Sequence, residues 1–161
     1  MKILIDLQSC QAPSARNRGI GKYSMSLAKA MLNQPREHDI YILLNKAYPE
    51  AIEEVRKELA GLISEQNIVE FGLSITALTE PHLNRKQALK AAQAIREYAI
   101  QVINPDIIHV TSLFGEVYGQ SAISLDDVAL ANKTVVTLYD LIPLINASKY
   151  LSDVNARTWY Y

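Results

Sequence analysis

The chain has 161 residues, which is enough for one ordinary domain with a hydrophobic core and short for two. Apolar residues make up 49% and charged residues 20%, a globular composition that excludes a disordered chain. The net charge of −1 argues against a general nucleic-acid binder, because such proteins carry a broad basic excess.

Short aliphatic runs alternate with segments of helical periodicity along the chain. Runs rich in Ile, Leu and Val predict buried strands, and they cover residues 2–7, 39–44, 67–71, 106–111 and 133–139. Two of the connecting segments show no clear periodicity. Residues 8–18 are predicted to form a polar loop, and residues 112–131 a loop with one short helix.

Three connecting segments carry apolar residues at helical spacing. The first helix is predicted to begin at Gly19 and end near Asn33, the second to cover residues 48–63, and the third, longer one to begin at residues 79–81. The residues expected on their buried faces are Ile20, Tyr23, Leu27 and Met31; Ile52, Val55, Leu59 and Leu62; and Ala92, Ile95, Ala99 and Val102. A further helix is expected to begin at Asn155.

This alternation predicts an α/β fold. Continuous apolar strands between helices are typical of a Rossmann-like, mostly parallel sheet with helices on both faces. Ligands bind such sheets beyond the carboxyl ends of the strands. We therefore expect three stretches to converge on a ligand site: the loop after Leu7, the segment after Thr111, and Tyr139 with Asp140.

The segment RNRGIGKYS (residues 16–24) brings three basic side chains and two glycines to this edge. It lacks the first glycine and the final Ser or Thr of a P-loop. Eleven residues separate Leu7 from Gly19, whereas the dinucleotide fingerprint has its glycines directly after the strand. The second strand also runs into Asn45 rather than an acidic residue that could hold a ribose. A nicotinamide cofactor is therefore not expected.

The segment still has the chemistry of a general anion site. Amides at a helix N-terminus bind phosphate, and Gly19 and Gly21 would let a ligand approach without meeting a Cβ. Arg16, Arg18 and Lys22 would add electrostatic attraction. A loop with a helix-starting glycine and solvated cations fits the same residues, and residue chemistry alone leaves both interpretations open.

The cysteine content and the N-terminus bear on the compartment. Cys10 is the only cysteine, so it forms no intrachain disulfide and lacks the clustered partners of a zinc site. Asp6 interrupts the apolar N-terminus too early for a signal peptide, and no apolar run approaches membrane-spanning length. We therefore expect a reduced, cytoplasmic location. His109, inside the fourth strand, is expected to be a packed, hydrogen-bonded histidine rather than a ligand.

Three stretches in order resemble the N-terminal half of GT-B glycosyltransferases. They are RGIGKYS at residues 18–24, PDIIHVTSLF at residues 105–114 and VVTLYDLIPL at residues 135–144. The similarity is greatest to the retaining, nucleotide-sugar-using family 4 enzymes, especially bacterial mannosyltransferase-like members that build surface polysaccharides. That resemblance implies two Rossmann-like domains facing across a cleft, the first binding acceptor and the second most of the donor. Residues 1–161 are then one truncated acceptor-side domain, the donor-binding domain is absent, and the chain alone is expected to be inactive.

The resemblance also assigns residues. Gly19 and Gly21 map onto the glycine loop that approaches the donor diphosphate, with Arg18 and Lys22 supplementing the field. Where the family commonly has a histidine beside the transferred sugar, this chain has Tyr139. We expect it to offer its hydroxyl to the sugar or the acceptor.

The next residue, Asp140, matches the family's aspartate. It can orient acceptor hydroxyls or cap the following turn, and both roles stay open. No metal and no cofactor is expected, because the nucleotide-sugar is itself the donor substrate. The Ser112–Glu116 segment departs slightly from the family's usual order of residues.

The implied function is transfer of a sugar from a nucleotide-sugar to a saccharide or lipid-linked acceptor, in cell-surface polysaccharide synthesis. No nucleic-acid partner is expected. A peripheral contact with the inner face of a membrane is a further implication. The alternative is a non-catalytic Rossmann-like module that binds a nucleotide or a protein. A second α/β domain with spaced glutamates downstream would favour the transferase.

Overall fold

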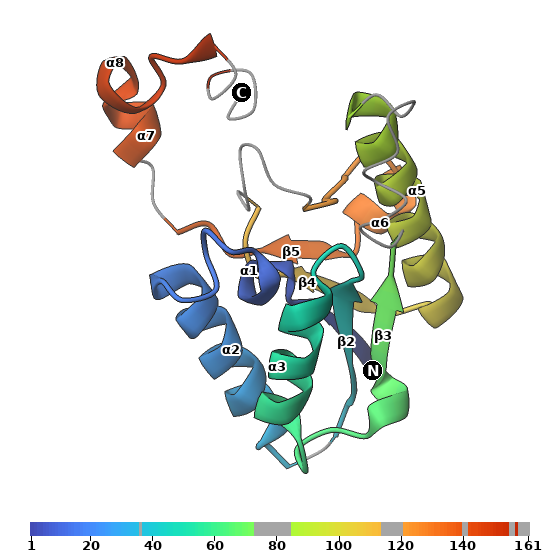
Figure 1. Ribbon diagram of the computed structural model, residues 1–161. Coiled ribbons are helices and arrows are strands. Elements are labelled where there is room, and N and C mark those ends of the chain that lie inside the picture. The colour runs from blue at the N-terminus through green and yellow to red at the C-terminus, as the bar shows by residue number, and fades with distance from the viewer. Residues whose placement is uncertain (36, 73–84, 114–120, 140–141, 155–156, 158–161) are drawn as a thin grey trace.

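A five-stranded, all-parallel sheet forms the centre of the computed structural model, which describes residues 1–35, 37–72, 85–113, 121–139, 142–154 and 157 (Figure 1). The strand order is β3-β2-β1-β4-β5. The strands are β1 (Lys2–Asp6), β2 (Asp39–Asn45), β3 (Ile68–Phe71), β4 (Ile107–Val110) and β5 (Thr134–Val136). All five predicted strands are confirmed, and so is the Rossmann-like α/β class.

Helices connect successive strands, and two short helices follow β5. The helices are α1 (Gln8–Gln11), α2 (Gly19–Leu32), α3 (Pro49–Leu59), η1 (Glu65–Asn67), α5 (Arg85–Ile103), α6 (Val128–Ala131), α7 (Ile142–Ile145) and α8 (Ala147–Tyr150). The first two predicted helices, the body of the third and the short helix α6 are confirmed. The sequence did not predict α1, α7 or α8. The predicted start of the long helix at residues 79–81 lies outside the described residues, as does most of the helix expected from residue 155.

The middle of the central strands is apolar on both sides because both faces of the sheet are covered there. Ile3 and Ile5 of β1 pack in one core with buried residues of α2 and α3. Leu4, which points to the opposite face, packs in a second core with residues of α5. Two layers of helices on a parallel sheet are therefore what the continuous strands encode.

The buried face of α2 differs from the prediction. Its buried residues are Gly21, Ser24, Ala28 and Leu32. Tyr23, predicted to be buried, is 51% exposed. Small side chains on the inner face of α2 let its backbone lie close to α1 and the sheet. The buried face is therefore the one with the small residues, and it is not the face that the apolar residues predicted.

The buried face of α5 was also partly mispredicted. Ala92 is buried as expected, but Val102 is 67% exposed. Arg96 is instead among the largest fully buried side chains. It lies one turn from Ala92 and one turn from the buried Ile100, in the middle of the inward stripe.

The C-terminal helices lie apart from the sheet (Figure 1). Ile142, Leu144, Ile145 and Tyr150 of α7 and α8 are all exposed. Among the described residues, no helix combines the length and apolar character needed to cross a membrane.

Candidate functional site

Four hydroxyl groups form a chain at the carboxyl edge of the sheet. Thr111, after β4, lies with its Oγ1 2.8 Å from the Oγ of Ser9 in α1. The Ser9 Oγ is 2.9 Å from that of Ser24 in α2, which is 2.9 Å from the Oη of Tyr139, after β5. The expected convergence of the segments after β1, β4 and β5 is therefore observed. Asp140 lies outside the described residues.

The phenol of Tyr139 is directed toward α2. Besides the contact with Ser24, its hydroxyl donates to the carbonyl of Ile20 at 3.4 Å. Its ring meets that of Tyr23 edge to face, with centroids 5.6 Å apart and planes at 85°. Burial raises the pKa of Tyr139, and the hydrogen bond with Ser24 partly offsets this. The hydroxyl expected to meet a sugar thus already has protein partners.

The two glycines at the start of α2 have different surroundings. A Cβ on Gly19 would meet nothing within 4 Å, so a ligand can approach the backbone there. A Cβ on Gly21 would lie 2.5 Å from the carbonyl oxygen of Arg16 and 2.7 Å from that of Ala15. The amide of Gly21 also donates to Ala15 at 3.2 Å. Gly21 is therefore required by the packing of the preceding loop, a reason that its sequence position does not reveal.

The amides that begin α2 remain available. Arg18 is the N-terminal cap residue and is exposed. Within the described part of the chain, no hydrogen bond uses the amide of Gly19 or that of Ile20. This end of α2 retains the anion-binding character that the sequence predicts, although any phosphate contact stays a prediction.

A cavity of about 390 Å³ separates α2 from α3 and is lined by Lys22. Its other charged lining residues are Arg16, Lys29, Glu54 and Glu58. Arg16 lies 3.4 Å from Glu54, and Lys29 forms an ion pair with Glu58. Lys22 lines this cavity, whereas Tyr139 contacts Ile20 and Ser24. The predicted site residues are therefore divided between two sides of α2.

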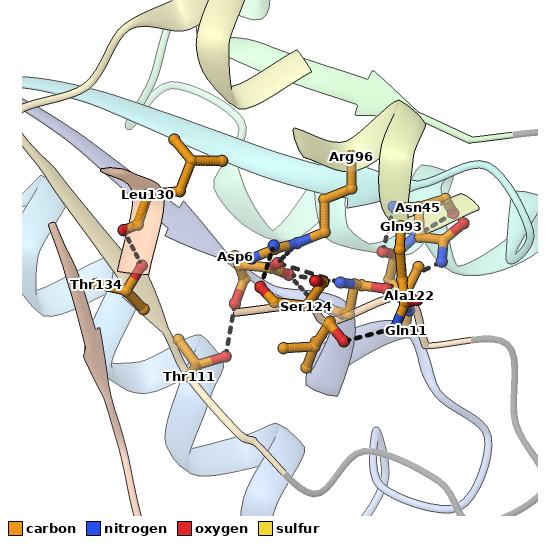
Figure 2. A network of polar contacts seen from close by, with 12 residues as sticks. Asp6, Gln11, Asn45, Gln93, Arg96, Thr111, Ala122, Ser124, Leu130 and Thr134 are labelled. Atoms are coloured by element: carbon orange, nitrogen blue, oxygen red, sulfur yellow. Dashed lines mark hydrogen bonds and ion pairs between the residues drawn. The ribbon is translucent and has the colours of Figure 1, made fainter. Parts of the chain in front are cut away.

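A buried ion pair joins the end of β1 to α5 (Figure 2). The Arg96 Nε donates to the Asp6 Oδ2 at 2.8 Å, and the two side chains are only 2% and 1% exposed. The backbone and side-chain amides of Gln8 donate to the same carboxylate at 3.1–3.2 Å. Asp6 thus accepts from an amide of the segment that follows β1, in a buried and fully bonded setting.

The network continues to the end of β2. The Gln8 Oε1 accepts from the Asn45 side chain at 2.9 Å and from the Ala122 amide at 2.8 Å. Gln11 bonds both backbone groups of Asn45, at 2.7 and 3.0 Å (Figure 2). The polar sequence after β1 is therefore a buried scaffold for the strand ends. Two features of the sequence could have indicated this network: the polar run directly after a buried strand, and an arginine in the inward stripe of α5.

Two other titratable residues have structural partners. The His109 Nε2 lies 2.9 Å from the Thr137 Oγ1, and burial lowers the pKa of His109. The predicted hydrogen-bonded histidine is confirmed, although it is only half-buried. Burial raises the pKa of Cys10 to about 12, and its thiol donates to the Gly21 carbonyl at 3.4 Å. Among the described residues, no cluster of three or more His, Cys, Asp or Glu side chains could hold a metal ion.

The fold is a Rossmann-like α/β domain in which the segments after β1, β4 and β5 meet at the carboxyl edge of the sheet, the edge where parallel sheets of this kind bind ligands. The chain is 35% identical over 161 residues to the Escherichia coli serotype-specific mannosyltransferase WbdA. That alignment spans 99% of this chain and 19% of WbdA. Two further E. coli proteins of that name are 33% and 36% identical over 135 and 138 residues, each alignment spanning 83% of this chain and 16% of the relative.

The chain thus spans about a fifth, or less, of the relatives that it matches. No protein-family model matches it, and no solved structure matches it. Homology therefore relates this domain to one part of a mannosyltransferase.

Proposed function

We propose that this chain is the acceptor-side domain of a retaining, family 4 glycosyltransferase of GT-B architecture. It would act in the cytoplasm or at the inner face of a membrane, in polysaccharide synthesis. The observation that carries the proposal is the 35% identity to a mannosyltransferase over essentially the whole chain. The sugar transferred is then mannose, from a nucleotide-sugar donor to a saccharide or lipid-linked acceptor. The ligand edge at the ends of β1, β4 and β5 supports the proposal, because substrates bind parallel sheets there.

The start of α2 is the part of this domain that we expect to approach the diphosphate of the donor. The open backbone at Gly19 and the unused amides of Gly19 and Ile20 suit a diphosphate. Arg18, exposed at the cap, adds positive charge. These groups would stabilise negative charge on the departing diphosphate, which is how a preorganised dipole lowers the barrier to transfer. Lys22 lines the cavity beside α3, so in this proposal it attracts the diphosphate through its positive charge and does not contact it.

The test uses the polypeptide that joins this chain to its donor-binding domain. Gly19→Val adds bulk where the backbone is open, so we expect kcat/KM for mannose transfer to fall about tenfold or more, with an unchanged melting temperature. Ala30→Val is the matched control, because Ala30 is exposed near the other end of the same helix. Normal kinetics for Gly19→Val would show that the glycine segment is structural.

A second measurement concerns the chain alone. Transfer requires both halves of the cleft to close over the substrates. We expect no transfer by the isolated 161-residue chain with nucleotide-activated mannose and a panel of mannoside acceptors. Turnover by the isolated chain would contradict the two-domain proposal.

A further inference from the structure

An exposed aromatic side chain lies beside the ligand edge. Tyr23, in the second turn of α2, is 51% exposed, although it is in contact with Tyr139 at the end of β5. The edge-to-face contact favours one orientation of the Tyr23 ring while leaving half of its side chain in solvent. Tyr23 is the more exposed member of the aromatic pair, because Tyr139 is only partly exposed and its hydroxyl is directed toward α2.

Hydrogen-bonded residues, most of them buried, lie behind Tyr23. The Tyr139 hydroxyl is 2.9 Å from the Ser24 Oγ, and Ser24 is fully buried. The Ser24 Oγ accepts from Ser9, whose hydroxyl also lies within hydrogen-bonding distance of Thr111, and both of these residues are buried. Thr111 in turn donates to the carbonyl of Asp6 at 2.8 Å. The aromatic pair is thus connected by hydrogen bonds to the end of the central strand. A preorganised aromatic ring loses little conformational freedom when a ligand covers it.

We infer that Tyr23 forms a subsite for a hexopyranose ring, with Tyr139 and Ser24 as positioning residues. One face of a pyranose carries several C–H groups and matches a flat aromatic ring, while its hydroxyls remain in water. Tyrosine suits this contact because it joins an apolar ring to a polar end. The inference rests on the proposed function, since the ligand edge and the homology to mannosyltransferases favour a sugar over other occupants.

The inference changes the role given to Tyr139. Its hydroxyl is engaged by Ser24 and Ile20, so Tyr139 acts through the ring of Tyr23 rather than by bonding the sugar itself. Tyr23 becomes the contact residue, which the apolar pattern of α2 had assigned to the core. Its exposure is a cost in water that contact with a sugar would relieve.

The experiment titrates the 161-residue chain with methyl α-D-mannopyranoside and follows the sugar protons by NMR. Protons stacked on an aromatic ring shift upfield, so a ring contact has its own signature. We expect Tyr23→Phe to bind as the wild type, because the ring is kept. Tyr23→Leu should lose the upfield shifts and bind about tenfold more weakly, a loss of about 1.4 kcal/mol.

Two controls separate this contact from a general effect of the substitution. Tyr98→Leu removes a tyrosine that is 68% exposed on α5, and it should bind as the wild type. Ser24→Ala should reduce the upfield shifts, because the ring is no longer held, whereas Ser26→Ala, exposed on the same helix, should not. Absence of binding by the wild type, or wild-type binding and shifts by Tyr23→Leu, overturns the inference.

The proposed function fails by a different measurement. It is overturned by the transfer assay on the two-domain polypeptide, in which no mannose would move. The sugar titration reports only on Tyr23, so a transferase without this subsite and a sugar-binding module without transfer give different pairs of results.

Discussion

Two polar assemblies meet at the carboxyl edge of the sheet, and they differ in charge and exposure. The assembly around Asp6 and Arg96 is charged and lies almost entirely out of solvent. The hydroxyl chain from Thr111 to Tyr139 is neutral, and it leads from a fully buried residue to a half-exposed aromatic pair. Both begin at Asp6, the first through its carboxylate and the second through its carbonyl oxygen.

The difference shows how one edge can be both rigid and accessible. A buried ion pair is tolerated only when each partner is satisfied, so the Asp6–Arg96 assembly is constrained to one geometry. Hydroxyls carry no net charge and can be exposed or buried at lower cost, so the second assembly can extend to solvent. The charged assembly therefore suits a role in stability, whereas the neutral one reaches the surface where the proposed ligand would bind.

The largest expected effect comes from breaking the charged assembly. Arg96→Met leaves the Asp6 carboxylate buried without its cation, so we expect the free energy of unfolding to fall by about 3–5 kcal/mol. Urea denaturation of the chain measures this. Lys90→Met, at an exposed position of the same helix, is the control and should change stability by less than about 0.5 kcal/mol. A similar small effect for Arg96→Met would contradict the distinction between the two assemblies.

The next largest effect on stability is expected where Gly21 packs against the loop that precedes α2. Gly21→Ala puts a Cβ 2.5 Å from the carbonyl oxygen of Arg16, and we expect a loss of about 1–3 kcal/mol in unfolding free energy. Gly19→Ala has open space and should stay within about 1 kcal/mol of the wild type. Thermal unfolding of both variants compares two glycines of one helix. Equal effects would mean that the close approach at Gly21 is not the reason for its glycine.

The neutral assembly should contribute less to stability. Ser24→Ala removes one of the four linked hydroxyl groups, and we expect the free energy of unfolding to fall by about 1 kcal/mol. Tyr139→Phe should cost a similar amount for the same reason. In the double variant the two losses should not add, because both remove the same hydrogen bond. Additive losses in urea denaturation would show that Ser24 and Tyr139 act independently.

The smallest effect depends on pH. Cys10 lies between the assemblies, and its pKa rises from 9.0 to about 12 on folding. Between these values the unfolded chain releases the thiol proton while the folded chain keeps it, so stability falls as pH rises. Between pH 7 and pH 9.5 this linkage removes about 0.8 kcal/mol. Cys10→Ala should lose that part of the pH dependence. An unchanged slope would assign the dependence to other groups.

The sheet was predictable because each strand is a short local run of aliphatic residues. The helices between the runs indicated that the strands are parallel. Parallel strands end at one edge of the sheet, which is where the ligand site was predicted. The convergence of the segments after β1, β4 and β5 needed no more than this. These features depend on patterns within a few residues of one another.

The side-chain contacts of the edge depend on pairs far apart in the sequence. Asp6 and Arg96 are 90 residues apart, and nothing local indicates that an arginine in an apolar stripe has a buried partner. The face of α2 was mispredicted for a related reason. Tyr23 counts as apolar in a periodicity argument, whereas the packed face is chosen by the small residues Gly21 and Ser24. Residue size and the loop backbone behind it decided that face.

The central position of β1 has a consequence for synthesis of the chain. Of the five strands of this sheet β1 is synthesised first, and its two neighbours are β2, from residue 39, and β4, from residue 107. Lys2 donates to Ile103 and Asp106, so the first residue of β1 is bonded by residues about a hundred positions later. At about 5–20 residues per second, one edge of β1 waits several seconds of translation for its partner. A nascent chain therefore holds its most central strand half-paired until β4 has emerged.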